Sequence, residues 1–256
     1  MNRLAILQIV EQIMTKRPIS VDYNTPVFVA EKQMLKNGIG HILVRRQGKH
    51  VKILSERYVL KLLPEKFNQL KSELSGSLAS SVPIFIEPST TIREAAKVML
   101  NNKVQLLLVS AKPQGVLTAT DLAYNLPLTD GRHPKLKSAM TARVEKVDYE
   151  TPLRDVILKM KEHRIGSIII TRRNKRFGIF TERDLLSIIV APVLILLNPV
   201  GKHCSRPIIT ASMKLSMKEV VEAMKRNRIK RLPLSQNGRI VGILTARDIV
   251  EAYAKL

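Results

Sequence analysis

A hydroxyl residue followed three positions later by aspartate recurs along this chain of 256 residues, each time directly after an aliphatic run. The pairs that share this pattern are Thr118 and Asp121, Thr181 and Asp184, and Thr245 and Asp248. At a helix start, such a carboxylate can accept two hydrogen bonds from the cis-hydroxyls of a ribose, and the hydroxyl and free backbone N–H groups suit a phosphate. A structural role is the alternative, because threonine caps helices and aspartate in the first turn favours the helix dipole. The pattern therefore indicates a nucleoside-binding turn or a capped helix.

The spacing of these turns predicts four structural repeats. With Ser55 as the first member, the hydroxyl residues are 63, 63 and 64 positions apart. A methionine also stands nine residues after the start of an amphipathic stretch in every copy, at Met34, Met99, Met160 and Met224. Two landmarks in phase indicate one repeated unit. We expect each unit to run β-α-β-β-α, with the second helix opening at the hydroxyl residue.

Local signals predict how these elements begin and which faces they bury. Thr25-Pro26 and Thr151-Pro152 predict an N-cap hydroxyl with proline at the first helical position. The methionines lie on the inner face of the first helix, so we expect core side chains. Short apolar runs predict buried strands: Ile42–Val44, Leu106–Val109, Ile168–Ile170 and Leu232–Leu234.

The repeats predict a mixed α/β (α+β) fold of two domains, residues 1–127 and 128–256. A unit of about 60 residues buries too little surface to be robust alone, so the copies should pair. The turn-forming segment Leu126–Pro134 is the expected boundary. The four predicted repeats cover residues 12–63, 76–126, 136–190 and 199–253.

Composition argues against several classes of protein. The single cysteine, Cys204, excludes an intramolecular disulfide and is expected to be a small buried residue. Five histidines show no metal-ligand spacing, and no phosphate-binding loop, dinucleotide fingerprint or serine-hydrolase elbow occurs. No signal peptide is evident, and the apolar segment Ile188–Leu197 is too short to span a bilayer. We therefore expect a cytoplasmic protein that is not an enzyme, with no metal site and no membrane contact.

The four copies resemble CBS domains, and two in tandem resemble a Bateman module. The resemblance rests on the recurring turns and extends from about Ile13 to Tyr253. Four copies in one chain also resemble the layout of the gamma subunit of AMP-activated protein kinase. This likeness implies two Bateman modules that bind AMP, ADP or ATP, or less often S-adenosylmethionine, as a regulatory ligand in clefts between paired copies. It also implies a client protein that responds to the bound ligand, and no catalytic cofactor.

In the family, a site combines the hydroxyl and aspartate of one copy with a base pocket from its partner copy. The resemblance implies a first site from Thr141, Val144, Lys146, Ile165, Gly166, Thr245, Arg247 and Asp248. It implies a second from Thr181, Arg183, Asp184, Ile208, Ile229, Lys230 and Arg231, and a third from Thr15, Ile19, Ile39, Gly40, His41, Thr118 and Asp121.

Within these implied sites, Arg231 is the expected phosphate ligand. His41 occupies the equivalent position and is either a phosphate contact or a hydrogen-bonded, half-buried histidine. The remaining site departs from the pattern, because Tyr58 replaces the aspartate and Leu78-Ala79-Ser80 replaces the usual Met-Thr opening. We expect that site to bind no nucleoside.

Charge is the feature that the resemblance leaves unexplained. The net charge is +22 and the isoelectric point is about 10.4. Residues 128–256 are the more basic half, and their densest runs are Arg172–Arg176 and Lys225–Arg231. An anionic partner such as a nucleic acid is the alternative function, although 4% aromatic residues and no tryptophan make base stacking scarce. A monomer and a homodimer both remain open.

Overall fold

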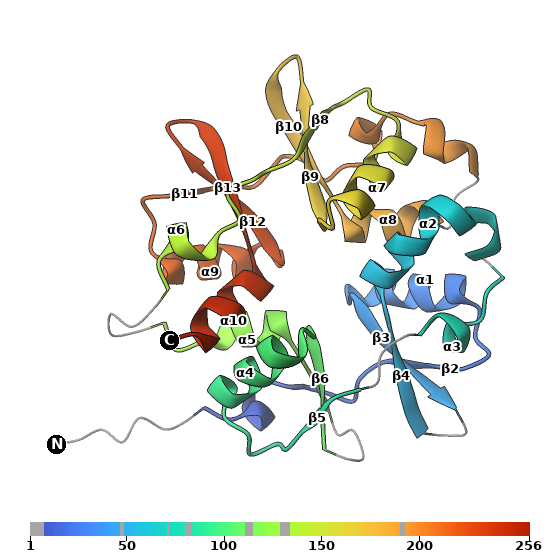
Figure 1. Ribbon diagram of the computed structural model, residues 1–256, viewed down its shortest axis with the longest axis vertical. Coiled ribbons are helices and arrows are strands. Elements are labelled where there is room, and N and C mark those ends of the chain that lie inside the picture. Colours follow the sequence, from blue (N-terminus) through green and yellow to red (C-terminus); the bar gives the residue numbers. More distant parts are fainter. Residues whose placement is uncertain are drawn as a thin grey trace. The chain divides into compact units, whose positions relative to one another are not determined.

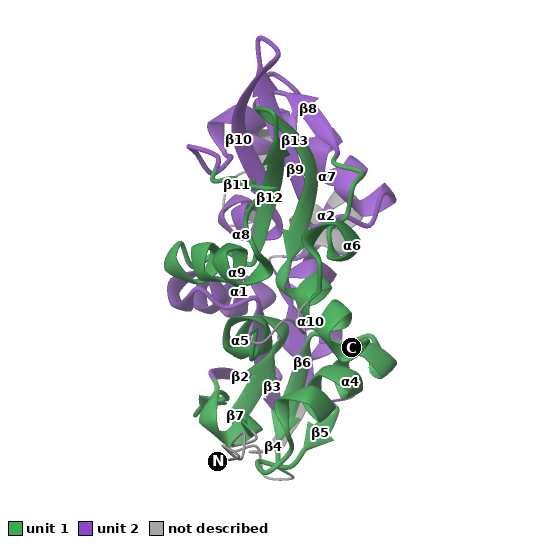
Figure 2. Cartoon of the chain, turned by 90° about the vertical axis from the view of Figure 1, so that its left-hand side faces the viewer, with its two compact units in different colours: residues 1–18, 84–144, 209–256 green, residues 19–83, 145–208 purple. Residues whose placement is uncertain are grey.

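The computed structural model describes residues 8–46, 49–70, 72–79, 83–110, 115–128, 134–189 and 193–256. The chain divides into two compact units, coloured separately in Figure 2. Unit 1 comprises Met1–Pro18, Ile84–Val144 and Ile209–Leu256, and unit 2 comprises Ile19–Pro83 and Glu145–Ile208. Each unit therefore holds the main body of two repeats that are not consecutive in the chain, the second and fourth in unit 1 and the first and third in unit 2.

Unit 1 contains two repeat bodies and the opening segments of two others (Figure 1). Its elements are η1 (Val10–Gln12), β1 (Thr15–Lys16), β5 (Phe85–Ile86), α4 (Ile92–Asn102), β6 (Leu106–Val109), β7 (Gly115–Thr118), α5 (Ala119–Asn125), α6 (Leu136–Ala139), β11 (Ala211–Ser212), α9 (Met217–Arg226), β12 (Arg231–Gln236), β13 (Arg239–Thr245) and α10 (Ala246–Ala254).

Unit 2 has the same plan. Its elements are β2 (Ser20–Asp22), α1 (Val27–Asn37), β3 (His41–Arg46), β4 (Lys49–Ser55), α2 (Glu56–Leu70), α3 (Ser75–Leu78), β8 (Lys146–Asp148), α7 (Leu153–Glu162), β9 (Ser167–Arg172), β10 (Lys175–Thr181), α8 (Glu182–Ile189), η2 (Val193–Leu197) and η3 (Val200–Lys202).

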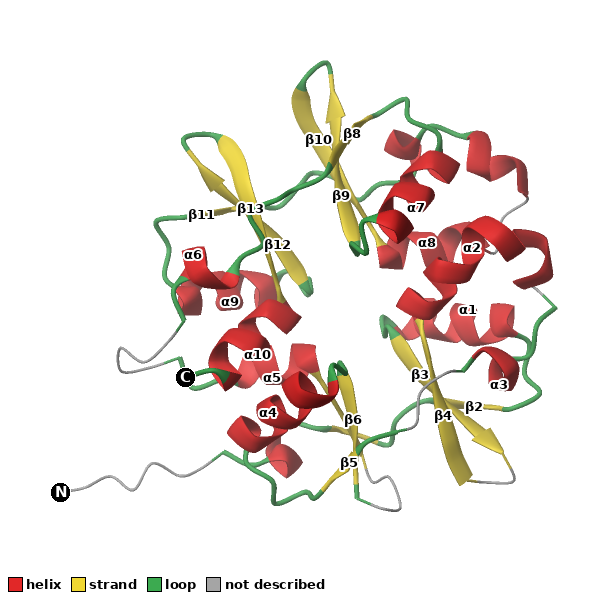
Figure 3. Ribbon diagram, in the orientation of Figure 1, coloured by secondary structure: helices red, strands yellow, loops and turns green. Residues whose placement is uncertain are grey.

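The predicted order β-α-β-β-α is confirmed in all four repeats, as the alternation of strands and helices in Figure 3 shows. In each repeat the first strand pairs in parallel with the second, across the helix that connects them. The second and third strands form an antiparallel hairpin. In the second repeat β1 joins as a fourth strand, giving the order β1-β7-β6-β5. The hairpin strand before each second helix thus ends at the hydroxyl residue of the signature.

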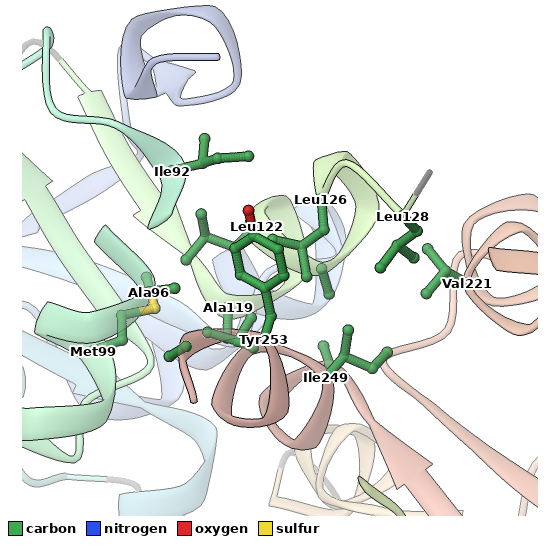
Figure 4. Close-up of a cluster of buried hydrophobic side chains, with 14 of the residues drawn as sticks. Ile92, Ala96, Met99, Ala119, Leu122, Leu126, Leu128, Val221, Ile249 and Tyr253 are labelled. Atoms are coloured by element: carbon green, nitrogen blue, oxygen red, sulfur yellow. The ribbon is translucent and has the colours of Figure 1, made fainter. Parts of the chain in front are cut away.

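Each unit has its own hydrophobic core, built largely from helices of its two repeats. In unit 1, α10 packs against α4 and α5, and Figure 4 shows Leu122, Ile249 and Tyr253 meeting there with Ala96 and Met99. In unit 2, α1 packs against α8, and α2 packs against α7 and α8. All four landmark methionines are buried, which confirms their predicted place in the core. The predicted apolar runs lie in β3, β6, β9 and β12 and are buried as well.

The predicted helix starts in the first and third repeats are wrong by one residue. Pro26 and Pro152 are themselves the N-caps, with extended backbone, and neither helix has a side-chain cap. The first helical N–H groups instead donate to backbone oxygens just before the next repeat, Val27 to Glu73 and Leu153 to Asn198. These bonds satisfy donors that a cap hydroxyl would otherwise serve.

Cys204 is half-buried rather than fully buried and packs against the core of unit 2. Residues 190–192 of the apolar segment and the centre of the expected boundary, residues 129–133, lie outside the described residues. No helix in the described part of the chain is long and apolar enough to cross a membrane. Pairing of consecutive repeats into modules 1–127 and 128–256 stays a prediction.

Candidate functional site

The three hydroxyl–aspartate turns have one geometry. In each, Oδ2 of the aspartate accepts hydrogen bonds from the backbone N–H and the hydroxyl of the threonine three positions earlier. The N–H distances are 2.8 Å at Asp121, 2.7 Å at Asp184 and 2.8 Å at Asp248. The hydroxyl distances are 2.7, 2.7 and 2.8 Å. These aspartates therefore bond to the helix start, as the structural interpretation of the sequence predicted, and a ribose would have to use their other oxygen.

That other oxygen differs among the three turns. Within the described part of the chain, no residue donates a hydrogen bond to Oδ1 of Asp121 or Asp248. Asp184 is different, because its Oδ1 accepts a hydrogen bond of 3.0 Å from the hydroxyl of Ser205. Asp121 and Asp248 thus keep acceptor capacity for a ligand hydroxyl, whereas Asp184 already uses both oxygens.

Partial burial shifts the pKa of the Asp121 and Asp248 carboxylates. Desolvation raises the pKa of Asp121 and of Asp248 above the ordinary aspartate value, although the hydrogen bonds from threonine oppose the shift. Lys230, which is in the same unit, acts on Asp121 in the opposite direction and lowers its pKa. Near Asp248, Glu251 raises the pKa and Arg247 lowers it. A half-buried carboxylate of this kind accepts hydrogen bonds in a poorly hydrated setting, where they are strong.

Beside each turn lies the opening segment of another repeat. Thr15 pairs with Val116 on β7, Thr141 with Ile243 on β13, and Ser205 with Ile179 on β10. Each partner stands two positions before the signature threonine. The openings of consecutive repeats are therefore exchanged: that of the first joins the sheet of the second, that of the third joins the fourth, and that of the fourth joins the third.

A glycine three positions before each threonine makes this exchange possible. A Cβ on Gly178 would lie 2.7 Å from the Cys204 sulfur and 2.8 Å from the Ser205 carbonyl oxygen. At Gly115 and Gly242 it would lie 2.7 Å and 2.5 Å from the methionine sulfur of the incoming segment. Any side chain there would therefore push the incoming hydroxyl residue away from the turn.

The exchange identifies a residue that the sequence analysis missed. Ser205 occupies the place that Thr15 and Thr141 hold beside their turns, and Cys204 occupies the place of the preceding methionine. A signal was present, since all three hydroxyl residues stand ten positions before the start of the amphipathic stretch. Serine in place of threonine and cysteine in place of methionine concealed it.

The first repeat departs from this arrangement. Lys52 stands where the other repeats have glycine, and its ammonium donates to the Gly76 carbonyl oxygen at 3.0 Å. Tyr58 holds the position of the aspartate, and its backbone N–H donates to the Ser55 hydroxyl at 3.2 Å. Ser80, part of the predicted opening, lies outside the described residues. The described residues of this turn thus provide no carboxylate equivalent to Asp121.

The structure brings together part of two of the three predicted sites. Thr141 lies beside Thr245, and Thr15 lies beside Thr118, through the strand pairings above. The remaining residues stay predictions as members of these sites. In unit 1 they are Val144, Ile229, Lys230 and Arg231, and in unit 2 they are Ile19, Ile39, Gly40, His41, Lys146, Ile165, Gly166 and Ile208.

The predicted equivalence of His41 and Arg231 is confirmed by strand register. Each begins the second strand of its repeat and pairs with the hydroxyl residue of the signature, His41 with Ser55 and Arg231 with Thr245. Directly opposed residues share one face of the sheet. Both side chains are half-buried and already have interactions within the protein.

Arginines next to two of the turns have protein partners. Arg183 donates to the Gly38 carbonyl oxygen at 2.8 Å, and Arg247 forms an ion pair of 2.6 Å with Glu251 one helical turn away. Arg57 of the first repeat donates to the Arg164 carbonyl oxygen at 3.0 Å. In unit 2, Arg57 and Arg183 thus each reach from one repeat to the turn after the first helix of the other. No group of three or more metal-ligating side chains occurs among the described residues.

Comparisons with known proteins agree on the nature of the repeats. The model of the CBS domain matches residues 10–65, 75–127, 136–191 and 200–255. The uncharacterized protein MK0525 of Methanopyrus kandleri is 34% identical over 103 residues, which are 38% of this chain and 51% of that protein. The chain thus spans about half the length of this relative. Protein MJ1225 of Methanocaldococcus jannaschii is 25% identical over 194 residues, which are 66% of this chain and 67% of that protein.

The crystal structure of MJ1225 has the same fold. It aligns with a TM-score of 0.82 and 20% identity, covering 96% of this chain and all of that one, and it is described as a proposed archaeal homolog of g-AMPK. An inosine-5'-monophosphate dehydrogenase from Thermoplasma acidophilum is 25% identical over 71% of this chain, but the matched part is only 35% of the enzyme.

Proposed function

Because the chain belongs to the CBS-domain family, we propose that it is a non-catalytic regulatory protein that binds AMP, ADP or ATP at its hydroxyl–aspartate turns. The observation that carries this proposal is the half-buried carboxylate of Asp121 and of Asp248, each with one oxygen bonded to the helix start and the other without a donor among the described residues. The two cis-hydroxyls of a ribose are suitable donors to that remaining oxygen, which has two lone pairs.

The incoming threonines support the same assignment. Thr141 and Thr15 are exposed and lie beside the two turns whose aspartates keep an acceptor. A hydroxyl and the N–H groups of a helix start suit the phosphate of the nucleotide. Lys230, whose charge acts on Asp121, adds a cation in unit 1.

We rank the third turn below the other two. Asp184 accepts the Ser205 hydroxyl, so a ribose would have to displace that hydrogen bond before it could bind there. The turn of Tyr58 should bind no nucleoside, since a phenol cannot make paired carboxylate contacts. A stoichiometry of two strong sites and one weaker site follows from this ranking.

In this proposal the bound nucleotide changes how the protein contacts a client protein, and no catalytic cofactor takes part. The part of the chain matched to CBS domains supports a regulatory role. The likeness to inosine-5'-monophosphate dehydrogenase gives no reason to propose an enzymatic activity, because the matched part is about a third of that enzyme. We infer a cytoplasmic site of action, and S-adenosylmethionine is the less favoured ligand.

Isothermal titration with AMP, ADP, ATP and S-adenosylmethionine tests the proposal. Asp121→Asn and Asp248→Asn retain an acceptor for the helix start and remove the charge. Each should weaken nucleotide binding by about 1.5–3 kcal/mol, or at least tenfold. Glu219→Gln is the matched control, because Glu219 makes the same capping contacts with Ser216 at the start of α9, away from any predicted site. Unchanged affinity in both aspartate variants would refute the ribose assignment.

A further inference from the structure

The turn between β9 and β10, in unit 2, gathers four exposed cations. Arg172, Arg173, Lys175 and Arg176 surround Asn174 at this turn, and none of them has a carboxylate partner among the residues that the structure describes. Arg173 and Asn174 have φ angles of 49° and 59°, and Arg172 pairs directly with Lys175. These angles fit a two-residue turn that follows the twist of the flanking strands. The hairpin therefore holds its cations on a short ribbon, which has a shift of register between Arg176 and Gly178.

Aromatic rings hold two guanidinium groups at the side of this ribbon. The Arg172 guanidinium lies over the Tyr149 ring, 4.6 Å from its centroid, and 5.8 Å from that of Phe177. Arg206 lies 5.5 Å from the Phe177 centroid, and the two rings meet edge to face at 5.0 Å. A stacked guanidinium keeps its N–H donors in its own plane, so they remain available to a planar anionic partner.

The first repeat supports this arrangement as a built feature. Arg46 holds the position equivalent to Arg172 and lies 5.2 Å from the centroid of Tyr23, the counterpart of Tyr149. Each tyrosine packs on a glycine of the following segment, Gly76 or Gly201, where a Cβ would overlap the ring. The close contact with this glycine therefore holds in place the ring on which the arginine lies.

We infer that the β9–β10 hairpin, together with Arg206, binds the phosphate backbone of a nucleic acid duplex. Arginine forks match phosphate oxygens, and a two-stranded ribbon is an element that the major groove of DNA admits. Every side chain from position 172 to 176 is polar, so the turn offers no apolar group to a lipid surface. Arginines cover the aromatic rings, which leaves phosphate contact rather than base stacking as the source of affinity. Binding should then be independent of sequence and strongly dependent on salt.

The test measures fluorescence anisotropy of a fluorescein-labelled duplex DNA of mixed sequence over a range of salt concentrations. The variant R173E/K175E/R176E reverses three charges and leaves the ring-bound Arg172 and Arg206 in place. The matched control K214E/K218E/R239E makes the same charge change on exposed residues of unit 1. Circular dichroism and AMP titration of all three proteins establish that fold and nucleotide binding are retained.

We expect the hairpin variant to lose about tenfold or more in affinity at low salt. The slope of log affinity against log salt should fall by about 3, since each phosphate contact contributes about 0.9. The control variant should keep most of the affinity and most of the salt slope. An equal loss in the two variants would show diffuse attraction by the net charge and overturn the inference. Binding to phosphatidylglycerol vesicles without binding to DNA would overturn it as well. Should the hairpin variant fail to fold, R173Q/K175Q/R176Q provides the same comparison with half the charge change.

Discussion

Glu31 on α1 is a fully buried acid in unit 2, and neither of its carboxylate oxygens has a hydrogen-bond partner among the described residues. It stands three residues before the landmark methionine of its helix. At the same position the other repeats have Ala96, Ile157 and Val221, all buried. Burial raises the pKa of Glu31 from 4.5 to about 8, so the side chain is neutral in the folded protein at neutral pH. We predict that Glu31→Leu stabilises the protein and removes much of its pH dependence.

The size of this stability effect follows from the difference in the pKa of Glu31 between the folded and the unfolded protein. The pKa of Glu31 is raised in the folded state, so the unfolded chain loses this proton first as the pH rises. The stability that neutral Glu31 allows is complete below pH 4.5, falls between pH 4.5 and 8, and stays low above pH 8. A difference of this size corresponds to a loss of about 5 kcal/mol in the free energy of unfolding. Leucine has no proton to lose and adds apolar contact in place of two unsatisfied oxygens.

Urea unfolding followed by far-ultraviolet circular dichroism, at about pH 5 and about pH 9, provides the measurement. The gap between Glu31→Leu and the wild type should widen by several kcal/mol from the lower to the higher pH. Glu31→Gln is the control for size and polarity: it should share the flat pH profile without the full gain in stability. Parallel pH profiles of wild type and Glu31→Leu would refute the reasoning, because they would mean that Glu31 titrates alike in both states.

Three further predictions concern packing and reactivity. Leu122→Ala empties a fully buried position in the core of unit 1 and should lower the free energy of unfolding by about 2–5 kcal/mol in urea titration; a loss below about 1 kcal/mol would contradict its place there. Gly178→Ala forces a Cβ against a backbone oxygen and should lower the free energy of unfolding by about 1–3 kcal/mol in the same assay. Gly238 has open space around it but a φ of 75°, so Gly238→Ala should lower the free energy of unfolding by about 1 kcal/mol. Equal costs would argue against the close approach. Burial, and secondly the charge of Asp184, raise the pKa of the Cys204 thiol. This thiol should therefore react with Ellman's reagent more slowly than free cysteine at neutral pH, and faster as the pH rises through its pKa. A rate equal to that of free cysteine would contradict this prediction.

Local features of this fold were predictable from sequence. The methionine and hydroxyl landmarks recur at fixed spacing, and short-range periodicity determines which helix face and which strand are buried. The turns at Thr118, Thr181 and Thr245 were equally accessible, because a threonine and an aspartate three positions apart meet within one helical turn.

Features that depend on distant segments were not predictable in the same way. Pro26 became an N-cap because the chain near Glu73 supplies acceptors to the helix start. Ser205 was not predicted because its role depends on pairing with Ile179, which lies on β10. Glu31 stands in a helix whose pattern alone does not reveal that α8, from another repeat, packs against it. Propensity and periodicity carry no information on such partners.

The most direct test of the proposed nucleotide sites is a crystal structure of the protein with the adenosine nucleotide that titration identifies. We expect ribose hydroxyls on Oδ1 of Asp248 and of Asp121, with the phosphate near Thr141 and Thr15 respectively. The Ser205 hydrogen bond should remain intact at Asp184 when the nucleotide is limiting. A nucleotide bound elsewhere, or one that reaches Asp184 first and leaves Asp121 and Asp248 without contacts, would show that these two aspartates are not the ribose ligands.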